Sequence, residues 1–219
     1  VSNRTLDNIR KTISSFFGWL NDEGHIGRNP ARALKQIKYP HVVRKPFSSV
    51  EREKLKNACE FLRDLALSEF LYASGLRVSE VASLDRDNID FITREASVIG
   101  KGAKERRFYL SEVCTEYLQQ YLKSRTDNNP ALFVAVKSPY KRLGKEGIEA
   151  AVKRIGRKAG VENVHPHRFR RTLATDLVRK NVPIQDVAEI LGHADLRTTQ
   201  VYVCLDRETV KYHYNRAVA

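Results

Sequence analysis

The sequence has few of the residues that form disulfides or structural metal sites. Its three cysteines, Cys59, Cys114 and Cys204, are far apart and include no Cys-x-x-Cys pair. An odd number at this spacing favours neither a zinc site nor a disulfide framework, and it predicts a reduced, cytoplasmic setting. The chain also lacks an apolar run of 18 residues, a signal peptide and any methionine. We therefore expect no membrane span, no secretory leader and a processing boundary at residue 1.

Acidic residues are fewer than basic ones. The 219 residues include 39 Lys and Arg against 26 Asp and Glu, which gives a net charge of +13. The excess is spread along the chain, whereas a disordered basic tail would form one block of like charge. The composition predicts a polyanionic partner, with nucleic acid first, although an ordinary solvated basic surface would look the same. The length allows one or two domains with a sizeable core.

Apolar spacing predicts a mostly helical chain. Helices are expected over residues 5–20, 29–34, 48–58, 61–74, 78–84, 112–124, 146–159, 167–180, 184–191 and 196–212. Because two short helices cannot bury their apolar faces alone, residues 1–40 are interpreted as the end of a domain whose first part is missing. Pro40 and Pro46 enclose an extended linker over residues 41–46.

One region departs from the helical pattern. Residues 89–110 form two apolar segments on either side of Gly100-Lys101-Gly102-Ala103-Lys104-Glu105-Arg106. Two strands around a glycine-bearing basic turn predict a hairpin or small sheet. The predicted fold class is therefore mostly α with a small antiparallel β-sheet (α+β).

Several basic residues occupy positions suited to binding an anion. His167 and Arg170 are three apart on a helix that starts at Pro166, so they share a face. Arg77 lies where one helix ends and another begins, near backbone N–H groups that can bind an anion. Lys101 lies between two glycines. Each signal is weak alone, because a solvated basic face explains the His167 and Arg170 pair more readily, and a flexible turn lysine explains Lys101 more readily.

Taken in chain order, five segments form one pattern. They are Ser74-Gly75-Leu76-Arg77-Val78-Ser79-Glu80, Ile99 to Arg106, Pro166-His167-x-x-Arg170, Leu191-Gly192-His193 and Thr198-Thr199-x-x-Tyr202. This pattern resembles the tyrosine recombinase (phage integrase) family, especially its Xer-like and mobile-element integrase branches. The resemblance covers residues 46–212 and implies a catalytic domain over residues 47–219. It also implies that residues 1–40 are the C-terminal part of a helical core-DNA-binding domain. Arg171 departs from the pattern, because relatives often have a second His there.

The resemblance implies a site-specific recombinase that cleaves and rejoins DNA through a 3′-phosphotyrosyl intermediate, without metal, ATP or cofactor. In the implied mechanism Tyr202 is the nucleophile, and His167 accepts or relays its proton. Lys101 protonates the leaving 5′ oxygen. The phosphate ligands implied are Arg77, Arg170 and His193. Glu80 has no expected phosphate role and is interpreted as a carboxylate that holds a catalytic cation.

The implied partners are double-stranded DNA with paired recognition half-sites and further copies of the chain, from dimer to tetramer. The setting implied is bacterial or phage-type and nucleoid-associated. A type IB topoisomerase has related chemistry, but the Gly-Lys-Gly hairpin and Leu191-Gly192-His193 favour a recombinase. The alternative from another class is a non-catalytic DNA-binding regulator, with a helix-turn-helix in residues 173–202. That alternative leaves Arg77 and Lys101 unexplained.

Overall fold

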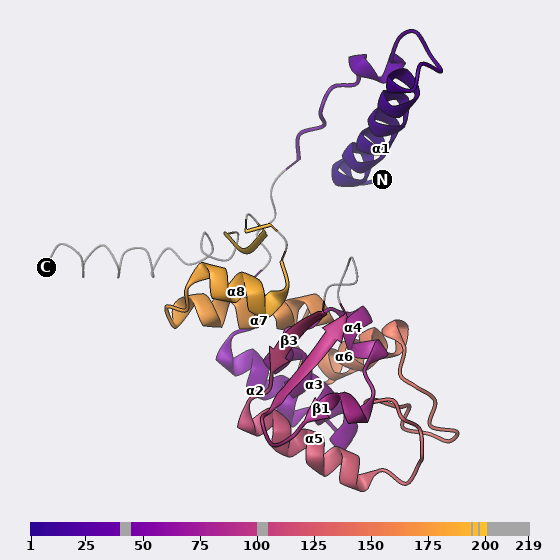
Figure 1. Ribbon diagram of the computed structural model, residues 1–219. Coiled ribbons are helices and arrows are strands. Elements are labelled where there is room, and N and C mark those ends of the chain that lie inside the picture. The colour runs from indigo at the N-terminus through magenta and orange to yellow at the C-terminus, as the bar shows by residue number, and fades with distance from the viewer. Residues whose placement is uncertain (40–44, 100–104, 194, 197, 201–219) are drawn as a thin grey trace, which may run out of the picture. The chain divides into compact units, whose positions relative to one another are not determined.

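The computed structural model describes residues 1–39, 45–99, 105–193, 195–196 and 198–200 (Figure 1). The chain divides into two compact units, Val1–Arg44 and Lys45–Ala219. The first unit contains α1 (Asn3–Asp22) and the short 3₁₀ helix η1 (Pro30–Ala33). Both helices expected in residues 1–40 are therefore present, the second as a single 3₁₀ segment.

Helix α1 exposes an apolar face. Its large apolar side chains on that face are 38–53% exposed: Leu6, Ile9, Ile13, Phe16 and Trp19. On the opposite side Asp7 is fully buried, and its Oδ1 accepts hydrogen bonds from Arg10 Nε at 2.8 Å and from the backbone N–H of Ile37 at 3.3 Å. Asp7 therefore holds the segment that follows η1 against α1, while the apolar face of α1 is exposed to solvent.

The second unit combines helices with a small sheet. Its elements are α2 (Ser49–Asn57), α3 (Leu62–Ser74), α4 (Val78–Ser83), η2 (Arg86–Asn88), β1 (Ile89–Asp90), β2 (Glu95–Ile99), β3 (Glu105–Tyr109), α5 (Glu112–Ser124), α6 (Lys145–Ala159), α7 (Pro166–Arg179) and α8 (Ile184–Leu191). The three strands are antiparallel in the order β1-β2-β3, with Ala96 opposite Phe108 and Val98 opposite Arg106. The predicted fold class, mostly α with a small antiparallel sheet, is confirmed. The helix expected over 196–212 falls largely outside the described residues.

Local sequence signals set the helix ends near the site. Ser48 caps α2, where its hydroxyl accepts from the Glu51 N–H at 3.1 Å and Glu51 accepts from the Ser48 N–H at 2.8 Å. This reciprocal pair is a capping box. Helix α3 ends at Gly75, which has φ +58°. A side chain there would strain the backbone and bring a Cβ within 2.7 Å of Leu173.

Helix α3 lies at the centre of the core. It packs against α5, α6, α7 and β3, and Figure 1 shows the sheet beside it. Phe70 of α3 is fully buried and meets the rings of Phe108 at 5.8 Å and Phe133 at 5.5 Å, both edge to face. Edge-to-face aromatic pairs add to the stabilisation from apolar burial. The core therefore fixes α3, whose C-terminal end leads directly into Arg77.

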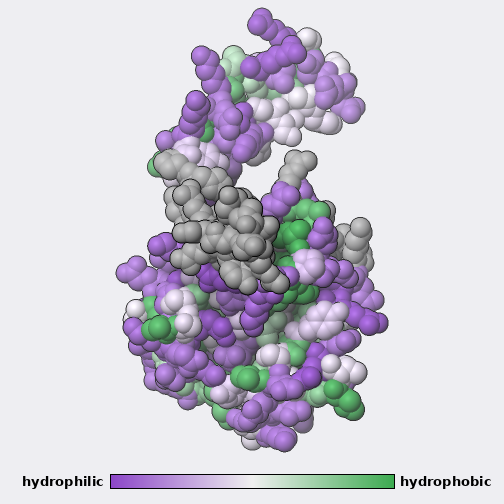
Figure 2. Space-filling model, turned by 90° about the vertical axis from the view of Figure 1, so that its left-hand side faces the viewer, coloured by the Kyte–Doolittle hydropathy of each residue, from purple (hydrophilic) through white to green (hydrophobic). Residues whose placement is uncertain are grey.

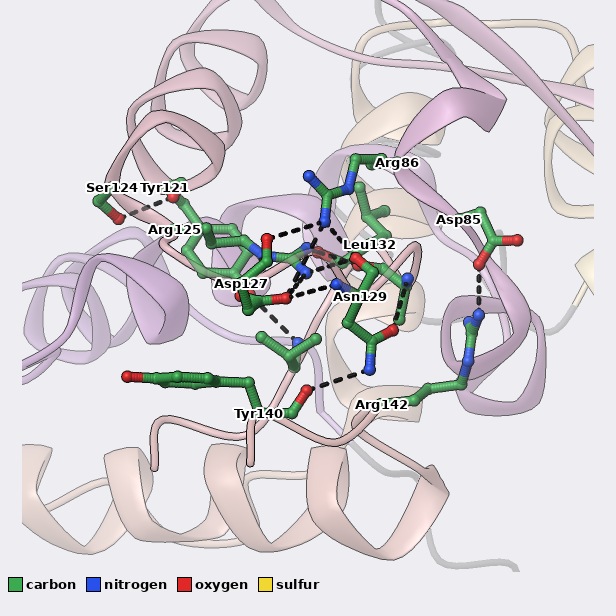
Figure 3. A network of polar contacts seen from close by, with 12 residues as sticks. Asp85, Arg86, Tyr121, Ser124, Arg125, Asp127, Asn129, Leu132, Tyr140 and Arg142 are labelled. Carbon is green, nitrogen blue, oxygen red and sulfur yellow. Dashed lines mark hydrogen bonds and ion pairs between the residues drawn. The ribbon is translucent and has the colours of Figure 1, made fainter. Parts of the chain in front are cut away.

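A polar network holds the long connection between α5 and α6 (Figure 3). Arg125 binds Asp127 with two hydrogen bonds, Nε to Oδ2 at 3.0 Å and Nη2 to Oδ1 at 2.6 Å. Arg125 also donates to the carbonyl oxygens of Asn129 and Ala131, and Arg86 donates to that of Asn129. Backbone groups without strand partners are thus satisfied by arginine side chains. The amino-acid pattern does not predict this arrangement.

The surface seen in Figure 2 is mostly hydrophilic, with hydrophobic side chains in small separate groups. Within the described ranges, no helix is both long enough and apolar enough to cross a membrane.

Candidate active site

Arg77 lies in the short connection between α3 and α4. Its backbone N–H donates to Glu80 Oε2 at 2.7 Å, and its Nη1 donates to Glu80 Oε1 at 2.9 Å. Its Nη2 donates to the carbonyl of Gly192 at 3.2 Å. About a third of the Arg77 side chain (35%) is exposed. A guanidinium has five N–H donors, so Arg77 is held on one side and open to a ligand on the other.

Glu80 binds a second arginine as well. This carboxylate is 6% exposed, and its Oε2 also accepts from Arg106 Nη2 at 2.7 Å. Burial by itself raises the pKa of Glu80, but the Arg77 backbone N–H and the charges of Arg106 and Arg77 outweigh it. The net effect lowers the pKa, so Glu80 is ionised at neutral pH. One buried carboxylate therefore links Arg77 to Arg106 on β3.

Helix α7 carries His167 and Arg170. Pro166 occupies its first turn, as the sequence predicts. Arg170 is 4% exposed and donates from Nη1 to the Gly75 carbonyl at 2.6 Å. His167 presents part of its ring to solvent. Partial burial of the ring lowers the pKa of His167, and the positive charges of Arg170, Arg171 and Arg77 lower it further. A neutral imidazole at pH 7 can accept a proton.

The C-terminal end of α8 is where the arginines meet. Helix α8 packs on α7 through a small apolar cluster and ends at Gly192, which has φ +64°. Its last carbonyl groups carry the negative end of the helix dipole, which favours cations. Three guanidinium groups bind three consecutive carbonyls: Arg106 Nη1 to Ile190 at 2.8 Å, Arg170 Nη2 to Leu191 at 2.5 Å, and Arg77 Nη2 to Gly192 at 3.2 Å.

His193 follows this helix end directly. Its Nδ1 lies 2.7 Å from the hydroxyl of Thr199, which is fully buried. Burial, then the charges of Arg170 and Arg77, lowers the pKa of His193 to about 4. The described residues thus bring together a neutral histidine and a cluster of fixed cations. Such a cluster can stabilise negative charge on the oxygens of a phosphate.

The structure brings Arg77, Glu80, Arg170 and His193 together around the end of α8, with His167 one turn before Arg170 on α7. Lys101 and Tyr202 lie outside the described residues. Residues Ile99 and Glu105, on either side of the Lys101 segment, are paired across β2 and β3. Within the described part of the chain, no group of three or more His, Cys, Asp or Glu could hold a metal ion.

Sequence reasoning gave no role to Arg106 or Thr199, although both lie in the quoted segments. Arg106 contacts Glu80 and Ile190, which are far away in the chain. Thr199 contacts a ring nitrogen of His193, and its role depends on which ring nitrogen carries the proton. Spacing alone reveals neither contact.

The second unit thus carries three arginines on one helix end beside His193, an arrangement that can bind an anion such as a phosphate. Residues 45–209 match the phage integrase family. Tyrosine recombinase XerC of Pseudomonas syringae pv. tomato is 33% identical over 224 residues, which cover 99% of this chain and 74% of that protein. XerC of Corynebacterium glutamicum is 32% identical over 225 residues, 99% and 72% of the two chains. The chain therefore belongs to the phage integrase family of tyrosine recombinases.

Solved structures agree with this membership. XerA recombinase is 26% identical in sequence to this chain. The two structures match over 95% of this chain and 83% of the XerA chain, with a TM-score of 0.71. The Tn1549 transposon integrase in complex with circular intermediate DNA is 20% identical, with coverage of 92% and 75% and a TM-score of 0.76. The protein is thus a site-specific recombinase, an enzyme that cleaves and rejoins DNA. The interpretation as a non-catalytic regulator is wrong.

Proposed function

We propose that this recombinase holds the scissile phosphate of DNA between Arg77, Arg170 and His193. The observation that supports this most directly is that the two arginines, far apart in sequence, bind adjacent carbonyls immediately before His193. Cations fixed before the reaction stabilise charge developing on the non-bridging oxygens without reorganising. Arginine suits this task because its planar guanidinium can bind two phosphate oxygens at once.

In the proposed reaction the phenolic oxygen of Tyr202 attacks phosphorus, and the bond from phosphorus to the 5′ oxygen breaks. A free phenol has a pKa of about 10, so the step needs a base, and the lowered pKa of His167 leaves its ring able to take the proton. Lys101 gives a proton to the departing 5′ oxygen. The 3′-phosphotyrosyl link conserves the bond energy, so a 5′ hydroxyl can rejoin the strand without ATP. None of these roles calls for a metal or cofactor.

The two parts of the chain have separate proposed tasks. Residues 1–40 are the C-terminal part of a helical core-DNA-binding domain, residues 41–46 are a linker, and residues 47–219 are the catalytic domain. The exposed apolar face of α1 supports the first assignment, because an isolated helix cannot bury such a face.

The proposed substrate is double-stranded DNA with paired half-sites, bound by two to four copies of the chain. Related structures motivate this proposal. XerH recombinase is bound to a palindromic difH substrate, and a lambda integrase dimer is bound to a COC′ core site. A palindromic site matches a two-fold assembly, because each half-site meets the same surface.

A suicide DNA substrate tests the proposed chemistry. A nick close to the cleavage point lets the short 5′-hydroxyl fragment diffuse away, so the enzyme stays attached to the 3′ phosphate. The unmodified protein should form a covalent adduct visible on a denaturing gel. Tyr202→Phe should form none while its DNA affinity stays within a few fold. Tyr109→Phe, at an exposed tyrosine of β3, is the matched control and should form the adduct. An adduct with Tyr202→Phe would overturn the assignment.

A further inference from the structure

We infer that Arg106 is a positioning residue for the strand-cleavage reaction. It holds Arg77 and His193 in the positions that the reaction needs. This inference rests on the phosphate roles proposed above for those two residues. Arg106 stands on β3, directly after the segment that holds Lys101, and its side chain is 12% exposed. Both terminal nitrogens are committed within the protein, Nη2 to Glu80 at 2.7 Å and Nη1 to the Ile190 carbonyl at 2.8 Å.

The first action of Arg106 is on Arg77 and passes through Glu80. The carboxylate is shared, with Oε1 on Arg77 Nη1 and Oε2 on both Arg106 Nη2 and the Arg77 backbone N–H. Two guanidinium groups and one carboxylate leave a local charge of one positive unit. Without Arg106, Glu80 would neutralise Arg77 and draw it into a tighter pair. Arg77 would then offer less positive charge to a phosphate.

The second action is on the backbone before His193. The stem of Arg106 lies over Gly192, where an added Cβ would come within 2.5 Å of Arg106 Cδ and 2.6 Å of Nε. Only glycine allows this approach, and its φ of +64° also suits glycine. Together with the bond to the Ile190 carbonyl, this contact fixes the end of α8 from the side of the sheet. The direction in which His193 leaves the helix therefore depends on Arg106.

The competing explanation is that Arg106 merely fastens β3 to α8. Three variants separate the two: Arg106→Gln, Arg106→Lys and the control Arg107→Gln. Arg107 is the next residue of β3, is 76% exposed and pairs only loosely with Glu95 at 3.7 Å. The measurements are the single-turnover cleavage rate of a suicide substrate at saturating protein, the DNA dissociation constant, and the melting temperature.

A positioning role predicts that Arg106→Gln cleaves on the order of 10- to 100-fold more slowly, as for loss of electrostatic support to a transition state. Its DNA affinity should stay within about threefold, because a nearly buried arginine contributes little to contacts with the phosphate backbone. Arg106→Lys keeps the charge beside Glu80 and should recover part of the rate. Arg107→Gln should cleave within about twofold of the unmodified protein, as surface changes usually do.

A double-variant cycle with Arg77→Lys gives the sharpest result. If Arg106 acts through Arg77, the two losses in rate should overlap, and the double variant should be faster than their product predicts by about tenfold or more. If the losses simply multiply, or if Arg106→Gln cleaves like Arg107→Gln, the inference is wrong. If Arg106→Gln does not fold, Arg106→Lys enters the same cycle, and its smaller loss in rate should likewise overlap with that of Arg77→Lys. An unchanged rate for Arg77→Lys alone would instead contradict the proposed role of Arg77.

Discussion

The Nδ1 atom of His193 lies 2.7 Å from the Oγ1 atom of Thr199, a fully buried hydroxyl. Because burial and the nearby arginines lower the pKa of His193 to about 4, its ring is neutral at pH 7 and carries a single N–H. A histidine that donates from Nε2 to a phosphate must accept at Nδ1, so the Thr199 hydroxyl must donate to it. Because a hydroxyl can donate as well as accept, Thr199 can support the tautomer that the proposed mechanism needs.

Replacing Thr199 with valine should slow cleavage without unfolding the protein. Thr199→Val keeps the shape of the side chain but removes the hydroxyl, and loss of one hydrogen bond corresponds to about a tenfold slower reaction. DNA affinity should change by less than about twofold, because the buried hydroxyl cannot meet DNA. Single-turnover cleavage measures the effect, with Thr198→Val at the exposed neighbouring position as the control. Equal rates for the two variants would show that Thr199 does not orient the ring.

The lowered pKa of His193 also predicts how stability depends on pH. In the unfolded chain His193 has the ordinary histidine pKa of about 6.5 and binds a proton below that pH. In the folded protein its pKa is about 4, so it binds a proton only near pH 4. Between these values the unfolded state holds more protons, so the free energy of unfolding falls as pH decreases. His193→Gln should lose less stability between pH 7 and pH 5 than the unmodified protein. Thermal unfolding at pH 7 and pH 5 measures this difference. Equal losses of stability in the two proteins would contradict the lowered pKa of His193.

Much of the fold follows from local signals in the sequence. Ser48 with Glu51 predicts the start of α2, Gly75 predicts the end of α3, and Pro166 predicts the start of α7; all three lie where expected. Each of these signals acts within a few residues, through a side chain that satisfies nearby backbone groups or a glycine with positive φ. Sequence reasoning therefore places these boundaries well.

The contacts that sequence reasoning did not predict cross long distances in the chain. Arg106 binds the Ile190 carbonyl and Arg125 binds several carbonyls of the following loop. A backbone carbonyl is present at every residue, so nothing in the amino-acid pattern marks the one that an arginine will reach. The family pattern identifies which residues gather, but only coordinates show that three arginines meet on one helix end.

Lys101→Ala should impair departure of the 5′ oxygen rather than DNA binding. A general acid typically contributes on the order of 100-fold or more to a rate, so we expect a loss of that size with normal DNA. Replacing the leaving 5′ oxygen with sulfur removes the need for a proton and should restore most of the rate. Both substrates are followed by single-turnover cleavage. A variant that cuts the sulfur substrate as slowly as the normal one would show that Lys101 is not the acid.

The last prediction concerns assembly and the tail of the chain, residues 207–219. The tail contains the apolar or aromatic residues Val210, Tyr212, Tyr214 and Val218 beside Lys211 and Arg216. In the recombinase family that the chain belongs to, we expect this segment to dock on a neighbouring protomer, which couples the nucleophile to assembly. Deleting residues 207–219 should leave binding to one half-site nearly intact, but should remove cooperative binding to a full site and slow strand exchange.

Gel-shift titration on substrates with one and two half-sites measures this cooperativity directly. A matched variant keeps the tail but changes Lys211 and Arg216 to glutamine. If apolar docking links the protomers, that variant should retain cooperativity, because its aromatic residues remain. If general positive charge is responsible, it should lose affinity for both substrates alike, since salt-dependent phosphate contacts do not distinguish the number of half-sites. Unchanged cooperativity after the deletion would mean that another surface joins the protomers.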